Sequence, residues 1–95
     1  MKLAWSNLAK QELLELKRYS VERWGRDVAL RYLEDVRDAA KGIAAKPDRA
    51  NSLKGPLRIF RVRSHYLIVH VDESARHVTI ARILHAAIDI DRHLP

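Results

Sequence analysis

The first half of the chain carries the hydrophobic period of two helices. A short alternating segment, residues 2–5, is typical of a strand, and Ser6 behind it is of the residue type that caps a helix. Residues 7–25 consist mostly of helix formers, and Gly25 ends them. Residues 28–45 repeat apolar positions at a helical spacing, on one face: Ala29, Tyr32, Leu33, Val36, Ala40 and Ile43. The one-glycine connection predicts an αα-hairpin in which Asp27 caps the second helix.

The second half has the period of strands. Residues 46–56 have the composition of a loop, residues 57–63 alternate, and residues 66–71 are almost continuously apolar, as expected of a strand covered on both faces. With residues 78–84 these segments predict an antiparallel meander in which residues 66–71 are central. The fold class is therefore α+β: a short N-terminal strand, an αα-hairpin packed on one face of a mainly antiparallel sheet, and a short C-terminal helical turn from Ala86 to Pro95.

The composition narrows the class of protein. A length of 95 residues predicts one domain, residues 1–95. The chain has no cysteine, which excludes disulfides and thiolate metal sites and fits a reducing compartment. No apolar run approaches the roughly 20 residues of a membrane span, and the first residues lack the apolar core of a secretory signal. We expect a soluble cytoplasmic domain without membrane contact.

The charge is unevenly distributed. The formal net charge is +6, residues 1–45 are nearly balanced, and all five histidines lie in the second half with most of the excess positive charge. Such a field favours a polyanion or an acidic partner, although solubility alone would also account for it. Within the second half, basic residues fall in or beside the predicted strands: Lys54, Arg58, Arg61, Arg63 and Arg82. A row of arginines suits phosphates or carboxylates of a partner or target, while exposed basic residues also discourage edge-to-edge strand pairing.

Arg82 and His85, at the end of the last strand, raise the question of catalysis. Metal-free RNA cleavage needs a base, an acid and a cation, and His85 and Arg82 could supply two of them. No second acid or base is obvious; His65 and Tyr66 are candidates by residue type only. Alternatively, His85 hydrogen-bonds to the backbone where the strand ends, which is the interpretation we favour.

Other kinds of site find little support. The histidine spacing contains no zinc-ligand pair and no glycine-rich phosphate loop is present, so we expect neither a metal nor a cofactor. The large aromatic residues lie on apolar faces and are expected in the core: Trp5, Trp24, Tyr19 and Tyr32.

Five pieces in order carry a resemblance to a known family: residues 3–25, "ALRYLEDV", the proline before the basic loop, "LRIFRVRSHYLIVHV" and the ending "VTIARILHAAIDIDRHL". Together they resemble the RelE/ParE superfamily of toxins from bacterial type II toxin–antitoxin systems, in particular its ParE branch, over almost the whole chain. The Leu-His-x-x-x-Asp pattern near the end is the most ParE-like part. The family fold agrees with the one that the periodicity predicts independently.

The resemblance implies a function and partners. ParE-like toxins are reported as poisons of DNA gyrase, whereas RelE-like toxins cleave messenger RNA on the ribosome with basic residues and a catalytic acid or base. Arg58, Arg61 and Arg82 fit the basic positions, but the C-terminal tyrosine of the nucleases is absent. We therefore expect a non-enzymatic gyrase inhibitor; the alternative is a ribosome-dependent nuclease using Arg61, Arg82 and His85. Either is expected to form a hetero-oligomer with a ParD-like antitoxin whose acidic, amphipathic segment fills an apolar groove beside the basic sheet.

Overall fold

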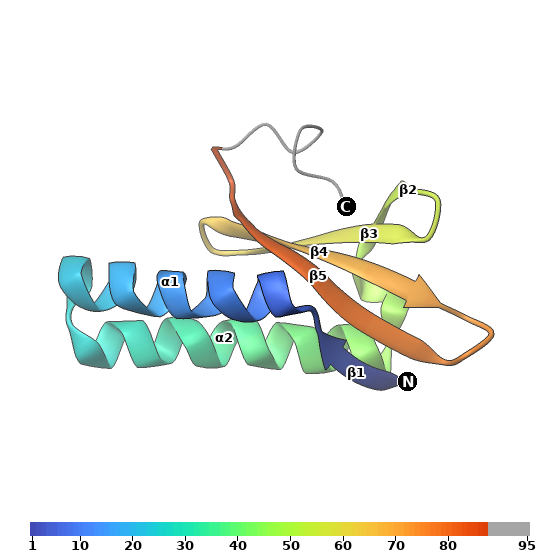
Figure 1. The fold of residues 1–95 in the computed structure, drawn as a ribbon, viewed down its shortest axis with the longest axis horizontal. Coiled ribbons are helices and arrows are strands. Elements are labelled where there is room, and N and C mark those ends of the chain that lie inside the picture. Colours follow the sequence, from blue (N-terminus) through green and yellow to red (C-terminus); the bar gives the residue numbers. More distant parts are fainter. Residues whose placement is uncertain (88–95) are drawn as a thin grey trace.

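The computed structural model describes residues 1–87 and contains a helical hairpin on one face of a sheet (Figure 1). The predicted C-terminal turn lies, from residue 88 onward, outside the described residues. In chain order the elements are β1 (Lys2–Trp5), α1 (Asn7–Trp24), α2 (Arg26–Ala45), the 3-10 helix η1 (Pro47–Arg49), β2 (Asn51–Lys54), β3 (Leu57–Val62), β4 (His65–Asp72) and β5 (His77–His85).

The hairpin begins and turns as the sequence predicts. The Ser6 hydroxyl accepts a hydrogen bond from the backbone N of Ala9 at 2.9 Å and so caps α1. Gly25 joins the two helices with φ +88° and ψ 168°, a conformation that is essentially confined to glycine. The prediction that Asp27 caps α2 is wrong. Gly25 itself is the N-cap, and Asp27 lies in the first turn of α2, where the helix dipole favours a carboxylate.

Within residues 1–87, the sheet has five strands in the order β1-β5-β4-β3-β2. The β1–β5 pair is parallel and the other pairs are antiparallel. The predicted central strand is confirmed: β4 lies in the middle, and Leu67, Ile68 and Val69 are completely buried. The prediction of a loop over residues 46–56 is wrong, because this segment contains η1 and β2. β2 is short, polar and at an edge, so its own sequence lacks an apolar alternation and its pairing with β3 depends on the neighbouring strand.

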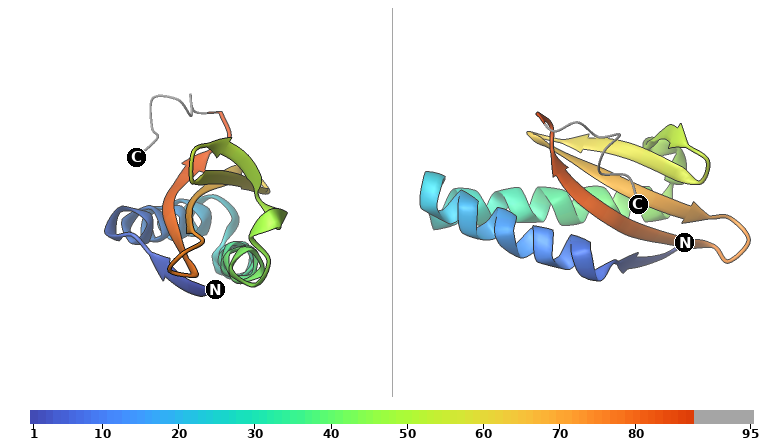
Figure 2. Two further views of the ribbon diagram at one scale, coloured as in Figure 1. Left: turned by 90° about the vertical axis from the view of Figure 1, so that its right-hand side faces the viewer. Right: turned by 45° about the horizontal axis from the view of Figure 1, so that its top comes forward.

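Both faces of the sheet bury apolar side chains. The main core lies between the sheet and the two helices, which cover one side (Figure 2). A smaller cluster of Leu57, Ile68 and Leu84 lies on the other face. In β5 the register with β4 shifts, so that Ile68 pairs with Arg82 and Val69 with Ile80. In a regular strand, Arg82 would lie on the same core-facing side as Ile80, two residues before it. The bulge interrupts this alternation and turns Arg82 away from the core.

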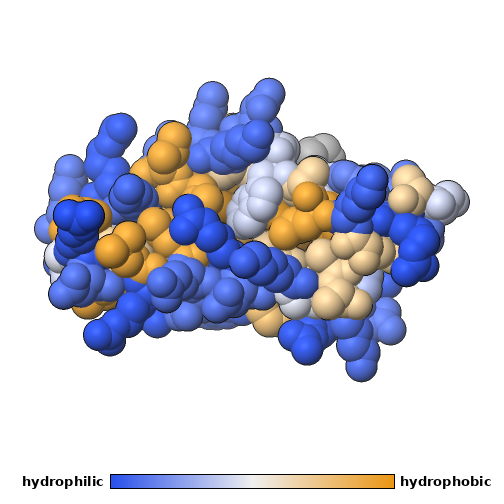
Figure 3. Space-filling view, turned by 90° about the horizontal axis from the view of Figure 1, so that it is seen from below, coloured by the Kyte–Doolittle hydropathy of each residue, from blue (hydrophilic) through white to orange (hydrophobic). Residues whose placement is uncertain are grey.

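The hairpin exposes several large apolar side chains, and apolar surface is visible over it in Figure 3. Tyr19 is 48% exposed and Trp24 44%, so the prediction that these two rings are core is wrong. The hairpin extends past the sheet at this end, and the sheet therefore does not cover them (Figure 1). Tyr32 is buried as predicted, and Trp5 is partly buried against the core.

Candidate functional site

An open groove of about 400 Å³ runs between α1 and the last part of β5. It exists because β1 ends its pairing with β5 at Trp5 and Ile80, so that α1 and not a strand neighbours β5 beyond this point. Both residues of the suggested nuclease pair, Arg82 and His85, line this groove. The other lining residues are Glu12, Glu15, Leu16, Tyr19, His65, Ile83 and Leu84. The groove is therefore the natural place to test catalytic chemistry.

Arg82 is bound within the protein. Its Nε and Nη2 atoms donate to the two carboxylate oxygens of Glu12 at 3.2 and 3.0 Å, and both side chains are mostly buried. The same carboxylate accepts a hydrogen bond from the backbone N of Ile83 at 3.0 Å. Glu12 thus replaces a strand partner at the edge of β5 and fixes the guanidinium beside it.

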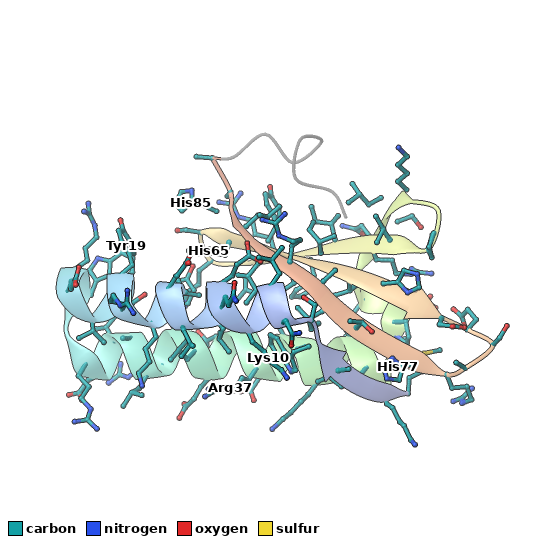
Figure 4. The ribbon with its side chains drawn as sticks, viewed as in Figure 1. Lys10, Tyr19, Arg37, His65, His77 and His85 are labelled. Carbon is teal, nitrogen blue, oxygen red and sulfur yellow. The ribbon has the colours of Figure 1, made fainter. Side chains whose placement is uncertain are left out.

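His85 meets a second histidine. It pairs in register with His65, and the two rings lie edge to face with their centroids 5.2 Å apart (Figure 4). The Nδ1 atom of His85 accepts a hydrogen bond from the backbone N of Ala87 at 3.1 Å, just after β5 ends. The His85 side chain is therefore both at the groove surface and bonded to the backbone of the following turn.

The Tyr32 hydroxyl contacts His65, the second histidine of the pair. It lies 2.6 Å from Nδ1 of His65 and accepts a hydrogen bond from the backbone N of Ser64 at 3.0 Å. Burial lowers the pKa of His65 below its ordinary value, and a charge on His85 lowers it further. The same hydroxyl also lies 3.4 Å from the Val62 carbonyl oxygen, to which it can donate. The network fixes the turn between β3 and β4 to α2.

The five basic residues that the sequence singled out do not form one surface. Arg58 lies on the helix-facing side of β3, where it donates to the Ala50 carbonyl at 3.2 Å and approaches Asp48 at 3.8 Å. Arg63 leaves the strand at the β3–β4 turn and binds Asp35 of α2 at 2.6 Å. Arg58 and Arg63 thus reach back toward acids near the helical layer, and their part in binding a partner or target stays a prediction.

Lys54 and Arg61 are more accessible. Lys54 ends β2 and is exposed. Arg61 is exposed on β3, donates through Nε to the Arg63 carbonyl at 2.8 Å, and lies 5.7 Å from the centre of the Tyr66 ring. Within residues 1–87, neither cation has a carboxylate within ion-pair distance. They are the members of the basic set that can offer a full charge to a partner.

The acids that neutralise the arginines escaped sequence reasoning. Glu12 lies 70 positions before Arg82, and nothing in the local pattern distinguishes it from Glu15 on the same helix. Tyr32 is buried, as the sequence predicts. Its hydroxyl also lies at hydrogen-bond distance from His65, a contact that the prediction of burial does not reveal. His65 was flagged by residue type, and only the strand register brings it to His85.

Residues 1–87 bring together no group of three potential metal ligands from His, Asp and Glu. Among the same residues, neither helix is long and apolar enough to cross a membrane.

Comparisons with known proteins agree with one another. Residues 3–90 match the family model of the ParE toxin of the type II toxin–antitoxin system parDE. Toxin ParE1 of Mycobacterium tuberculosis is 32% identical over 92 residues, which cover 94% of this chain and 93% of the relative.

Solved structures share the fold. A chain of the chromosomal ParDE system from P. aeruginosa superposes with a TM-score of 0.76 at 19% identity, over 90% of this chain and 95% of the other. A chain of the toxin–antitoxin complex RelBE2 from Mycobacterium tuberculosis reaches 0.68 at 18% identity, over 88% and 95%. The α+β fold with its αα-hairpin is thus that of the RelE/ParE superfamily. On the family match and the close relative, the chain belongs to the ParE toxins of type II toxin–antitoxin systems.

Proposed function

We propose that this ParE-type toxin is neutralised by a cognate ParD-like antitoxin, with which it forms a hetero-oligomer in the cytoplasm, and that the free toxin acts on DNA gyrase. The antitoxin part of the proposal is supported by the family, which is that of parDE systems, and by a structural neighbour solved as a toxin–antitoxin complex. The gyrase part follows from the resemblance to the ParE branch. It is supported further by the charge arrangement in the groove.

The observation that carries the choice against a nuclease is the ion pair of Arg82 with Glu12. RNA cleavage without a metal needs a cation facing the charged phosphorane. Both prongs of Arg82 are directed at a carboxylate, and Glu15 adds another negative charge to the lining. A groove with two carboxylates and one already paired arginine repels a phosphate backbone more than it attracts one.

One observation favours the alternative of a ribosome-dependent messenger RNA nuclease. His65 and His85 face each other in the groove, and the lowered pKa of His65 keeps one imidazole neutral, which a general base requires. His65, a candidate by residue type, would then be the second acid or base. The Tyr32 hydroxyl and the Ala87 backbone each occupy one nitrogen of the pair, however, and this arrangement also suits a structural role.

A growth assay tests the proposal of a neutralised toxin. Cells that express the toxin alone should stop growing. Co-expression of the product of the neighbouring gene should restore growth, and this product should co-purify with the toxin. Growth that is unaffected by the toxin, or a toxin that stays monomeric beside that product, would overturn this part.

Lys54 and Arg61 remain the proposed contact residues: Lys54→Gln and Arg61→Gln should weaken toxicity or antitoxin binding without unfolding the protein, because both side chains are exposed.

A further inference from the structure

A second hollow lies on a different face of α1 from the groove just described. It has a volume of about 240 Å³ and is formed by β1, α1 and α2. Its apolar floor consists of Leu3, Trp5 and Leu13, which pack against the main core. Its rim consists of three basic residues, Lys10, Arg37 and Lys41. We call this hollow the Trp5 pocket; Figure 4 labels two of its rim residues, Lys10 and Arg37.

Within the described residues, the three rim cations have no ion-pair partner. Arg58, Arg63 and Arg82 each have a carboxylate within 4 Å, but Lys10, Arg37 and Lys41 have none among residues 1–87. Arg37 and Lys41 are also four residues apart on one face of α2, a spacing at which like charges repel each other. Three cations around an apolar floor therefore form a basic rim that an acidic partner would complement.

We infer that the Trp5 pocket is a docking site for an acidic segment of the antitoxin, which inserts an apolar side chain between Trp5 and Leu13 and places carboxylates against Lys10, Arg37 and Lys41. The inference rests on the proposed function, because it takes the antitoxin as the occupant. It adds a location that the sequence did not indicate, since these cations lie on the helical layer and not on the sheet. The volume suits side chains and not a whole folded element.

The shape of the pocket favours a protein segment over a nucleic acid. Proteins that bind single strands offer exposed aromatic rings for stacking and a positive groove that follows the backbone. Here the one aromatic ring is half-buried against the core, the rest of the floor is aliphatic, and the cations surround a single apolar spot. An apolar anchor within a charged rim is the arrangement of a protein–protein hot spot. The charges should speed association, and the anchor should slow dissociation.

The first experiment measures binding of the full-length toxin to the purified product of the neighbouring antitoxin gene. Lys10→Gln, Arg37→Gln and Lys41→Gln are combined in one variant. The control combines Lys17→Gln, Arg18→Gln and Arg31→Gln, which removes the same charge from exposed positions of the same helices outside the pocket. At low salt, the association rate of the pocket variant should fall about tenfold or more, whereas the control should stay within about twofold. The difference should shrink in high salt.

The second experiment observes the anchor. The chain has two tryptophans, so Trp24→Phe leaves Trp5 as the only indole. Addition of the antitoxin should shift the indole N–H resonance of Trp5 and its fluorescence maximum. Because the test does not alter the pocket, it stays informative even if a pocket variant loses stability.

The outcomes separate the two proposals. If the antitoxin binds the wild type but leaves Trp5 unchanged, or slows equally for the pocket variant and the control, the docking site is refuted and the proposed function stands. If the antitoxin does not bind the wild type, both fail. If a mixed-sequence single-stranded RNA shifts Trp5 and loses affinity in the pocket variant, the pocket is a nucleic-acid site and the inference is overturned.

Discussion

Glu12 and Arg82, 70 positions apart in the chain, join α1 to β5 through a two-pronged ion pair. The pair lies where β1 has ended, and the Glu12 carboxylate also accepts the backbone N–H of Ile83. One side chain therefore closes the open edge of a strand and removes a cation from the groove. The architecture of the fold and the charge of the groove depend on the same carboxylate.

Replacement of Glu12 should destabilise the protein. Glu12→Ala leaves the guanidinium of Arg82 and the N–H of Ile83 without this acceptor in a mostly buried position, which should cost about 2–3 kcal/mol of unfolding free energy. Urea denaturation measures this loss. Glu15→Ala is the matched control on the same helix and groove, and should change stability by no more than about 0.5 kcal/mol because Glu15 is exposed. Equal losses for both variants would contradict the role assigned to Glu12.

The Tyr32 hydroxyl should contribute to stability independently of its ring. Tyr32→Phe keeps the buried ring but removes the partner of the Ser64 N–H and of Nδ1 of His65, at an expected cost of about 1–3 kcal/mol. Tyr19→Phe is the control, because Tyr19 is exposed and its described contacts are made by the ring. Thermal denaturation of the two variants should separate them; a Tyr32→Phe variant as stable as the wild type would show that the network contributes little.

Stability should depend on pH through His65. Burial, together with the charge of His85, lowers the pKa of His65 in the folded protein below its unfolded value of 6.5. The unfolded chain therefore binds more protons than the folded one as the pH falls through 6.5, and the unfolding free energy decreases. Above this pH, the contribution of His65 is fully present. Urea denaturation at pH 7.5 and pH 5.5 should reveal the loss.

Two variants assign this dependence to the right residue. His65→Asn keeps a hydrogen-bond acceptor near the Tyr32 hydroxyl but cannot titrate, so it should reduce the loss of stability between pH 7.5 and pH 5.5. His70→Gln, at an exposed position of the same strand, should leave the loss unchanged. An undiminished loss in His65→Asn would place the titrating group elsewhere.

The predictable part of the fold is the part that periodicity encodes. α2 is buried on one side and therefore shows one apolar helical face. β4 is buried on both sides and therefore shows a continuous apolar run, and the sequence predicts both elements. β2 was missed because a short polar edge strand owes its conformation to its neighbour β3. The exposure of Trp24 was missed because a helical period indicates a face but not how far the sheet beneath it extends.

The site was less predictable than the fold. Arg82 and His85 were found because a cation and a histidine stand together at the end of a strand. Their partners Glu12 and His65 are set by tertiary packing and strand register, which one sequence does not reveal. Arg58 is predicted to contact a partner by residue type, and the structure places it with Phe60 and Val62 on the helix-facing side of β3.

The most direct test of the gyrase proposal is to determine what breaks in cells that express the toxin. DNA double-strand breaks, induction of the SOS response and the 5′ ends of messenger RNAs are measured in parallel for the wild type and for His85→Gln, which roughly keeps the reach of the side chain but cannot titrate. We expect DNA breaks and an SOS response with intact messages, unchanged by His85→Gln. Codon-positioned cuts in translated messages, abolished by His85→Gln, would contradict the account and establish the nuclease.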